Sequence, residues 1–213
     1  MKKTLITLAF FSLLAKTTAQ QLYLDVFTGY NRTIYEPDFP EQKPYLVAGA
    51  RLAAGSDWIQ LGGEARTNVT NPAFEFGSRE DTHKETYCGG FVRAKLAKYP
   101  AMRFGLVVRA GAGVHQIETH FNGNLVERLD YGNVFGMNGG AGFSIPLARA
   151  VMLELGYTYN YVKRPERAIP GLIVAREFDG HFHSVQAGLS LNFVFGKRAA
   201  EYREVRESRQ WRK

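Results

Sequence analysis

Residues of alternating polarity run through most of this chain, and this two-residue period restricts its fold more than any other feature. Successive side chains of a β-strand point to opposite faces of a sheet, so a strand between two different environments shows such alternation. In one segment, for example, Ile59 and Leu61 alternate with Gln60 and Glu64. The alternating segments, each predicted to be one strand, are 21–31, 44–54, 58–68, 86–97, 102–117, 132–145, 151–163 and 182–195. The chain is therefore predicted to be all-β.

Charged residues within the cores of these strands fall on one face of each strand and never on the other. They are Asp25, Arg51, Glu64, Arg66, Arg93, Lys95, Arg103, Arg109 and Glu154. A charge that faces lipid near the bilayer midplane costs about 2–4 kcal/mol, whereas a charge inside a barrel is tolerated. The distribution is therefore typical of strands with one face in lipid and one face in a polar interior.

The faces without charge carry aromatic residues towards both strand ends. Tyr30 and Phe135 lie near one end, and Phe143 and Phe193 near the other. Aromatic belts of this kind flank the hydrocarbon layer of a membrane. The alternative is an exported soluble, lipocalin-like barrel that binds a small ligand in an apolar interior. The charges and many glycines of the polar face favour the membrane barrel.

Connections between the strands alternate between long and short. The long, polar ones are 31–43, 68–85, 119–131 and 164–180, and the short ones are 55–57, 98–101 and 146–150. Long extracellular loops and short periplasmic turns alternate in this way in outer-membrane barrels. Because lipid demands a helix or a closed sheet, we predict an eight-stranded antiparallel up-and-down transmembrane β-barrel with both ends on the periplasmic side.

The two ends of the chain differ from its body. Residues 1–19 are predicted to be a signal peptide, with a positive start, an apolar stretch over 5–15 and cleavage after Ala19. The barrel is expected over 20–196, and 197–213 form a short charged periplasmic tail. The two ends carry the whole formal net charge of +7, so the charge gives no argument for nucleic-acid binding. Cys88 is the single cysteine, which excludes an intramolecular disulfide.

An ion network inside the barrel is the best candidate site. Its predicted members are Asp25, Arg51, Glu64, Arg66, Arg93, Arg109 and Glu154. Glu64 and Glu154 are expected to pair with the arginines and to form a structural plug, since a barrel of this size has room for little beyond its own side chains. The alternative is a gated ion path. With Lys95 and Arg103 included, inward cations outnumber inward anions, so any opening is expected to favour anions.

No catalytic, cofactor-binding or metal site is predicted. His181 and His183 share one strand face, but no third metal ligand is apparent. Ser184 beside them raises a lipid-modifying enzyme as an alternative, yet no outward Ser, His and Glu form a sensible set. The glycines of 139–142 lack the strand–turn–helix context of a phosphate loop.

The last predicted strand resembles the C-terminal signal by which outer-membrane barrels are recognised for insertion. The residues that carry this pattern are Gln186, Gly188, Leu191, Phe193 and Phe195. With it, the body over 21–195 resembles the OmpX/OmpA-type family of small outer-membrane barrels. The resemblance implies residence in the outer membrane, contact with its lipid and help from the barrel-assembly machinery. The resemblance does not settle function, because small barrels of this kind include adhesion proteins, membrane tethers, lipid-modifying enzymes and assembly factors. We predict a structural or surface-interaction role with no cofactor, and an extracellular or periplasmic protein partner stays open. The chain departs from the family by continuing beyond Phe195, with a tail too short for a folded peptidoglycan-binding domain.

Overall fold

The computed structural model describes most of the chain body. The described residues are 21–34, 43–56, 58–70, 73–76, 79–98, 105–120, 128–148, 150–164, 167–169, 172–175 and 178–194. The predicted signal peptide, the charged tail, Arg103 and Phe195 lie outside these ranges. Among the described residues, no helix is long and apolar enough to cross a membrane.

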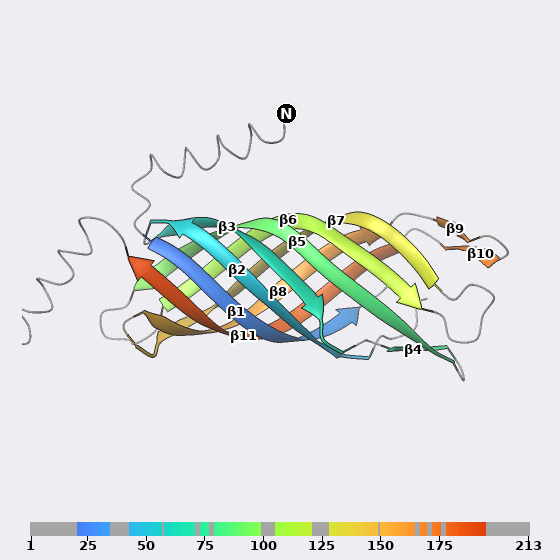
Figure 1. Cartoon of the computed structure of the whole chain (residues 1–213), viewed down its shortest axis with the longest axis horizontal. Helices are drawn as coiled ribbons and strands as arrows, with labels where there is room; N and C mark the ends of the chain where they lie inside the picture. Colours follow the sequence, from blue (N-terminus) through green and yellow to red (C-terminus); the bar gives the residue numbers. More distant parts are fainter. Residues whose placement is uncertain are drawn as a thin grey trace, which may run out of the picture.

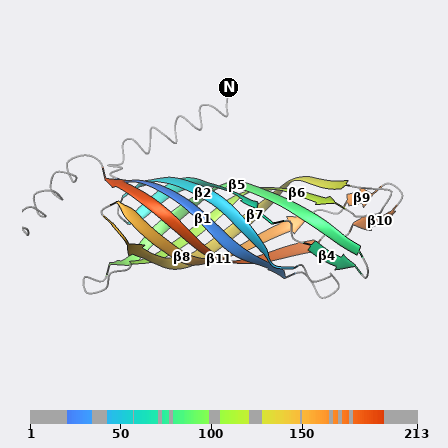
Figure 2. The ribbon, with the colours of Figure 1, turned by 60° about the horizontal axis from the view of Figure 1, so that its bottom comes forward.

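Eight long antiparallel strands form one closed sheet within the described part of the chain (Figures 1 and 2). They are β1 (Gln21–Ile34), β2 (Tyr45–Gly55), β3 (Ile59–Asn68), β5 (Arg79–Lys98), β6 (Gly105–His120), β7 (Arg128–Pro146), β8 (Val151–Arg164) and β11 (Phe178–Val194). Neighbours in sequence pair with one another, β1 pairs with β11, and β3 pairs with β5 across the short β4. The predicted fold class, an eight-stranded antiparallel up-and-down barrel, is confirmed.

All four connections predicted to be long loops contain more strand than expected. β1 continues to Ile34, past its predicted end at residue 31. β5 begins at Arg79, β7 at Arg128 and β11 at Phe178, each before its predicted start. The short strand β4 (Ala73–Phe76) pairs with the start of β5, and β9 (Arg167–Ile169) and β10 (Leu172–Ala175) form a separate hairpin. The predicted strands are too short because polarity alternates only where the two faces of a strand meet different environments. The backbone hydrogen bonds between strands continue past that point.

A bulge distorts the sheet near the loop end of β6 and β7. The register jumps from the Gln116–Asn133 pair to the Glu118–Asp130 pair, so β7 contains an extra residue. Gly132 lies in this bulge with a φ of 67°, which a side chain would strongly disfavour. The bulge marks the place where the ladder leaves the regular barrel.

The two ends of the barrel sheet meet at the short-turn end of the molecule. Gln21, the first residue of β1, pairs with Val194, the last residue of β11, and with Gly55 beside the first short turn. The other short turns join Lys98 to β6 and Pro146 to β8 at this same end. An even number of strands requires this arrangement, as the alternating loop lengths predicted.

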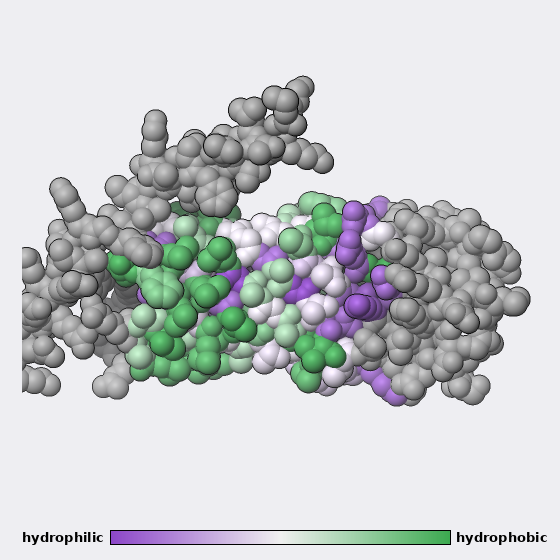
Figure 3. All heavy atoms as spheres, in the orientation of Figure 1, coloured by the Kyte–Doolittle hydropathy of each residue, from purple (hydrophilic) through white to green (hydrophobic). Residues whose placement is uncertain are grey.

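The outer surface of the barrel is apolar over the turn end and the middle. Figure 3 shows hydrophobic residues gathered over the turn end of this face, residues of intermediate hydropathy in the middle, and many hydrophilic ones near the loop end. Val26 and Leu189, side by side on β1 and β11, are 62% and 56% exposed. Cys88 is also exposed. So many exposed large apolar side chains on a closed sheet suit lipid better than water.

An arginine on the outer surface tests this assignment. Val26→Arg should lower the free energy of unfolding in lipid vesicles by about 2–4 kcal/mol, because it places a charge in hydrocarbon. Val69→Arg is the matched control, since Val69 is 61% exposed but follows the end of β3 on the loop side. It should cost about 0–1 kcal/mol. Urea titration measures both, and equal losses would contradict a lipid-facing barrel wall.

Candidate functional site

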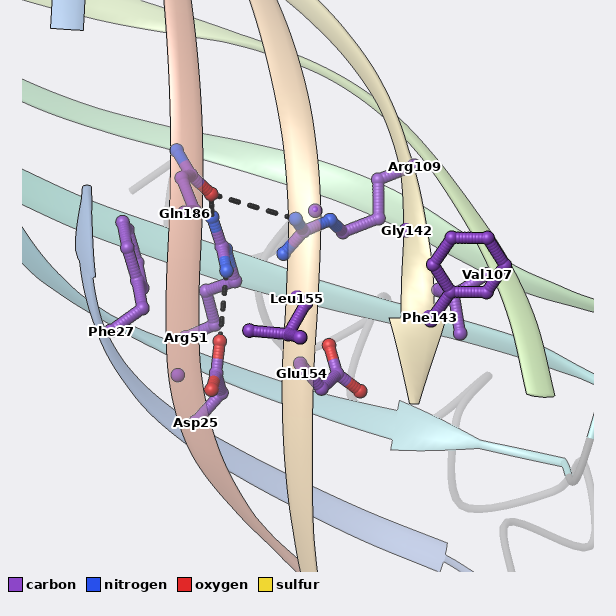
Figure 4. Close-up of a pocket in the computed structure, with 12 residues that line it drawn as sticks. Asp25, Phe27, Arg51, Val107, Arg109, Gly142, Phe143, Glu154, Leu155 and Gln186 are labelled. Atoms are coloured by element: carbon purple, nitrogen blue, oxygen red, sulfur yellow. Dashed lines mark hydrogen bonds and ion pairs between the residues drawn. The ribbon is translucent and has the colours of Figure 1, made fainter. Parts of the chain in front are cut away.

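Arg51 on β2 lies inside the barrel and joins side chains from three other strands. Its Nη1 donates to Asp25 Oδ2 at 2.8 Å, its Nε to Glu64 Oε2 at 2.6 Å, and its Nη2 to Gln186 Oε1 at 2.5 Å. The register explains this meeting, because Asp25, Arg51 and Glu64 stand opposite one another on β1, β2 and β3. Figure 4 shows the guanidinium between Asp25 and Gln186. We call Arg51 with these three partners the Arg51 cluster.

Aromatic packing and a second arginine extend the Arg51 cluster. The Arg51 guanidinium lies 3.6 Å from the centre of the Phe27 ring, and Arg66 Nη1 donates to Glu64 Oε1 at 3.4 Å. Gly49 makes the ring position possible, since a Cβ there would come within 2.5 Å of Phe27 Cζ. This inward glycine therefore makes room for an aromatic ring in the lumen.

A second pair crosses the interior nearer the turn end. The Arg93 Nη2 atom on β5 donates to Glu154 Oε1 on β8, and Arg93 Nη1 donates to Gln60 Oε1 at 2.7 Å. Tyr23 donates from its hydroxyl to Glu154 Oε2 at 2.8 Å, and its ring lies 4.3 Å from the Arg93 guanidinium. Because β5 and β8 are not neighbours in the sheet, this Arg93–Glu154 bridge spans the lumen.

Arg109 is held less firmly than the other inward arginines. Among the described residues its one hydrogen bond joins Nη2 to Gln186 Oε1 at 3.5 Å, and no carboxylate lies within ion-pair distance. It lines a small cavity together with Asp25, Arg51 and Glu154, shown in Figure 4. Arg109 therefore adds a positive charge to the middle of the lumen, and it forms no ion pair with a described carboxylate.

A polar layer on the loop side of Arg66 contains residues that the sequence analysis missed. Glu85, which falls in a predicted loop, is buried and lies 2.5 Å from His115 Nδ1. Tyr87 packs against His115, with 4.7 Å between ring centres, and accepts a hydrogen bond from Asn138. Glu85 adds a carboxylate to the lumen, so the excess of inward cations is smaller than predicted.

An apolar layer covers the interior at the loop end. It contains the buried residues Tyr45, Val47, Ile117, Val134, Val162 and Phe182. These side chains stand on the faces that were predicted to be polar. The sequence carried a signal for this layer, because valine, isoleucine and phenylalanine replace polar residues on those faces towards the loop end. The interior is therefore a stack of ionic, aromatic and apolar layers, where a mainly polar one was expected.

The remaining predicted residues are placed as follows. Lys95 is half-buried opposite Val107, and Ser184 is buried inside the barrel, away from outward-facing His181 and His183. Of the predicted insertion signal, Gln186 and Gly188 face the interior, whereas Leu191 and Phe193 are exposed on the outer wall. Among the described residues, no group of His, Cys, Asp and Glu is arranged to hold a metal ion.

Solved structures share this architecture, although no family model and no curated protein sequence matches the chain. Neisserial surface protein A is similar at a TM-score of 0.60 and 11% identity, over 80% of this chain and 96% of that chain. OprG from Pseudomonas aeruginosa (TM-score 0.48, 11% identity, 84% and 98% covered) and Ail of Yersinia pestis (0.45, 11%, 82% and 100%) are more distant. The chain has the fold of a small eight-stranded outer-membrane β-barrel.

Removal of one member of the Arg93–Glu154 bridge should be strongly destabilising. Glu154→Ala leaves Arg93 Nη2 and the Tyr23 hydroxyl without their acceptors, and about 3–5 kcal/mol of unfolding free energy should be lost. The double variant Arg93→Met/Glu154→Met removes both charges and should lose much less. Urea titration in vesicles measures both variants. A double variant as unstable as the single one would mean that the pair is not buried in the lumen.

Proposed function

We propose that this chain is an outer-membrane barrel with a sealed interior, which acts as a structural or surface-interaction protein through its outer wall and its loops. The observation that carries the proposal is the Arg51 cluster, in which one arginine binds side chains from β1, β3 and β11 across the lumen. The Arg93–Glu154 bridge and the apolar layer stand on either side of it. A soluble barrel for an apolar ligand would need the opposite arrangement, with an apolar interior and a polar wall.

The proposed orientation follows from loop length. The four long connections lie at one end of the barrel, and the short turns and both ends of the sheet lie at the other. Outer-membrane barrels have long extracellular loops and short periplasmic turns. We therefore place both mature termini in the periplasm and the four long connections outside the cell, where a protein partner would meet them.

The proposed role is not enzymatic. Ser184, the serine beside the two outward histidines, is buried inside the barrel, and Asp25 and Glu154 point inward as well. On β1, β8 and β11, the described side chains thus hold no nucleophile–histidine–carboxylate set on the outer wall. The proposed partners are the membrane lipid, the barrel-assembly machinery during insertion, and a protein that binds the loops.

A sealed lumen predicts that the unmodified chain gives no steady conductance in planar bilayers. Glu64→Ala should raise the frequency of openings, because it removes the acceptor of Arg51 Nε and of Arg66 Nη1. These openings should favour anions, since the remaining lumen holds more arginine than carboxylate. Glu64→Gln keeps the volume of the side chain and should open less often. A large, stable, cation-selective current from the unmodified chain would contradict the proposal.

The C-terminal strand should be required for insertion, because without it β1 and β8 would expose unpaired edges to lipid. Deletion of 186–213 should therefore abolish assembly in cells, whereas deletion of 198–213 should leave it intact. Heat-modifiable migration on a gel distinguishes the folded barrel from the unfolded chain in membrane fractions. If the shorter deletion blocks assembly as completely as the longer one, the barrel does not end where we place its end.

A further inference from the structure

The small cavity beside Arg109 has the features of a binding site. Its polar lining comes from five strands, with Asp25 on β1, Arg51 on β2, Arg109 on β6, Glu154 on β8 and Gln186 on β11 (Figure 4). It has room for about one water-sized molecule. The size of the cavity therefore restricts its ligand to a very small molecule or ion.

Glycines keep this part of the lumen open. Gly142, Gly156 and Gly188 line the cavity on β7, β8 and β11. A Cβ at Gly188 would come within 2.6 Å of Asp25 Oδ1, and a Cβ at Gly156 within 3.6 Å of Arg109 Nη2. Any side chain at these positions would therefore take up space beside the polar groups.

Two polar atoms at the cavity are complementary to each other. Asp25 Oδ1 is an acceptor and Arg109 Nη1 is a donor, and both are buried without a hydrogen-bond partner among the described residues. Asp25 binds Arg51 through its other oxygen, Oδ2, and Arg109 reaches Gln186 Oε1 through its other nitrogen, Nη2. A buried polar group without a partner is costly, so both atoms favour a ligand that donates to one and accepts from the other.

The charges around the cavity favour a neutral ligand. Two guanidinium groups, Arg51 and Arg109, and two carboxylates, Asp25 and Glu154, line it. An anion would meet both carboxylates, and a cation would meet both guanidinium groups. Water carries no charge, donates two hydrogen bonds and accepts two, and it is the usual occupant of small polar cavities in proteins.

We propose that this cavity binds one ordered water molecule, which accepts a hydrogen bond from the Arg109 guanidinium and donates one to Asp25 Oδ1. Among the described residues, the 3.5 Å contact with Gln186 is the one hydrogen bond that joins Arg109 to the Arg51 cluster. The water adds a second connection, so β6 is held to β1 as well as to β11. Arg109 and Asp25 are the binding residues, and Gly156 and Gly188 leave the space. The inference rests on the sealed interior of the proposed function.

The test detects the water by NMR in the full chain, folded in detergent micelles. Glycine α-protons do not exchange with solvent, so a nuclear Overhauser effect between them and water reports a bound water directly. It should appear at Gly188 and Gly156, whose inward α-protons point along the Cβ directions given above. It should be absent at Gly90, exposed on the outer wall, and at Gly49, whose inward α-proton faces the Phe27 ring.

Variants locate the water. Gly156→Ala places a methyl group in the cavity and should abolish the signal at Gly188. Gly63→Ala is the matched control, because Gly63 is exposed on the outer wall and its Cβ would meet only Gly89 O, at 3.7 Å. It should keep the signal. Arg109→Met removes the donor and should lower the affinity for the water by about tenfold, with a corresponding loss of signal. It tests the site even where Gly156→Ala does not fold.

Three results would overturn the inference and leave the proposed seal intact. Heat-modifiable migration first shows which variants fold. A folded, unmodified chain without a water signal at Gly188 would mean a dry cavity. A signal that persists in folded Gly156→Ala and Arg109→Met would come from elsewhere. Saturable shifts of the Arg109 guanidinium signals with sodium chloride, together with loss of the water signal, would identify an anion as the ligand.

Failure of the proposed seal has a different signature. Water contact at Gly49 as well as at Gly188 would mean that water fills the lumen. That result would contradict the sealed interior and a discrete water site together.

Discussion

Closure of the backbone hydrogen-bond ladder is the constraint on which the rest of this structure depends. A sheet in lipid has no water to satisfy the free N–H and C=O groups of an edge strand, so it must close on itself. Here the closing pairs are β1 with β11 and β3 with β5, where the register runs without interruption from Ile59–Ala94 to Thr67–Thr86. Eight strands enclose a narrow space, which their own inward side chains must fill.

Most of the buried charges inside the barrel lie beside an oppositely charged partner. Asp25, Arg51 and Glu64 occupy one row across adjacent strands, and the Arg93–Glu154 bridge joins opposite walls. Removal of one partner of a buried pair costs far more than the pair contributes, so these residues tie the sides of the barrel to each other. The apolar layer at the loop end adds packing without charge and separates the ionic layers from the loops. The proposed seal of the interior and the stability of the barrel would thus have the same physical origin, and the proposed function belongs to the wall and the loops.

The sequence predicted the strands and the direction of their side chains, because the period-two pattern records both. It also placed the arginines and carboxylates of the network inside. It predicted that Glu64 and Glu154 pair with arginines but not which arginine each one meets, since Arg51 and Gln186 are 135 residues apart and Arg93 and Glu154 are 61 apart. Gln186 was assigned to an insertion signal, and its contact with Arg51 depends on barrel closure, which local pattern does not encode. Glu85 and the strands β4, β9 and β10 were missed because alternation weakens where both faces of the ladder meet similar surroundings.

Hydrogen exchange of the backbone amides in lipid vesicles tests the closed barrel most directly. The seam between β3 and β5 is the critical region, because it joins strands that are separated in sequence by β4. The account predicts that amides over 60–67 and 86–93 exchange as slowly as those of the β1–β11 pair. Fast exchange along this seam, with slow exchange elsewhere in the sheet, would show an open edge and would contradict the account.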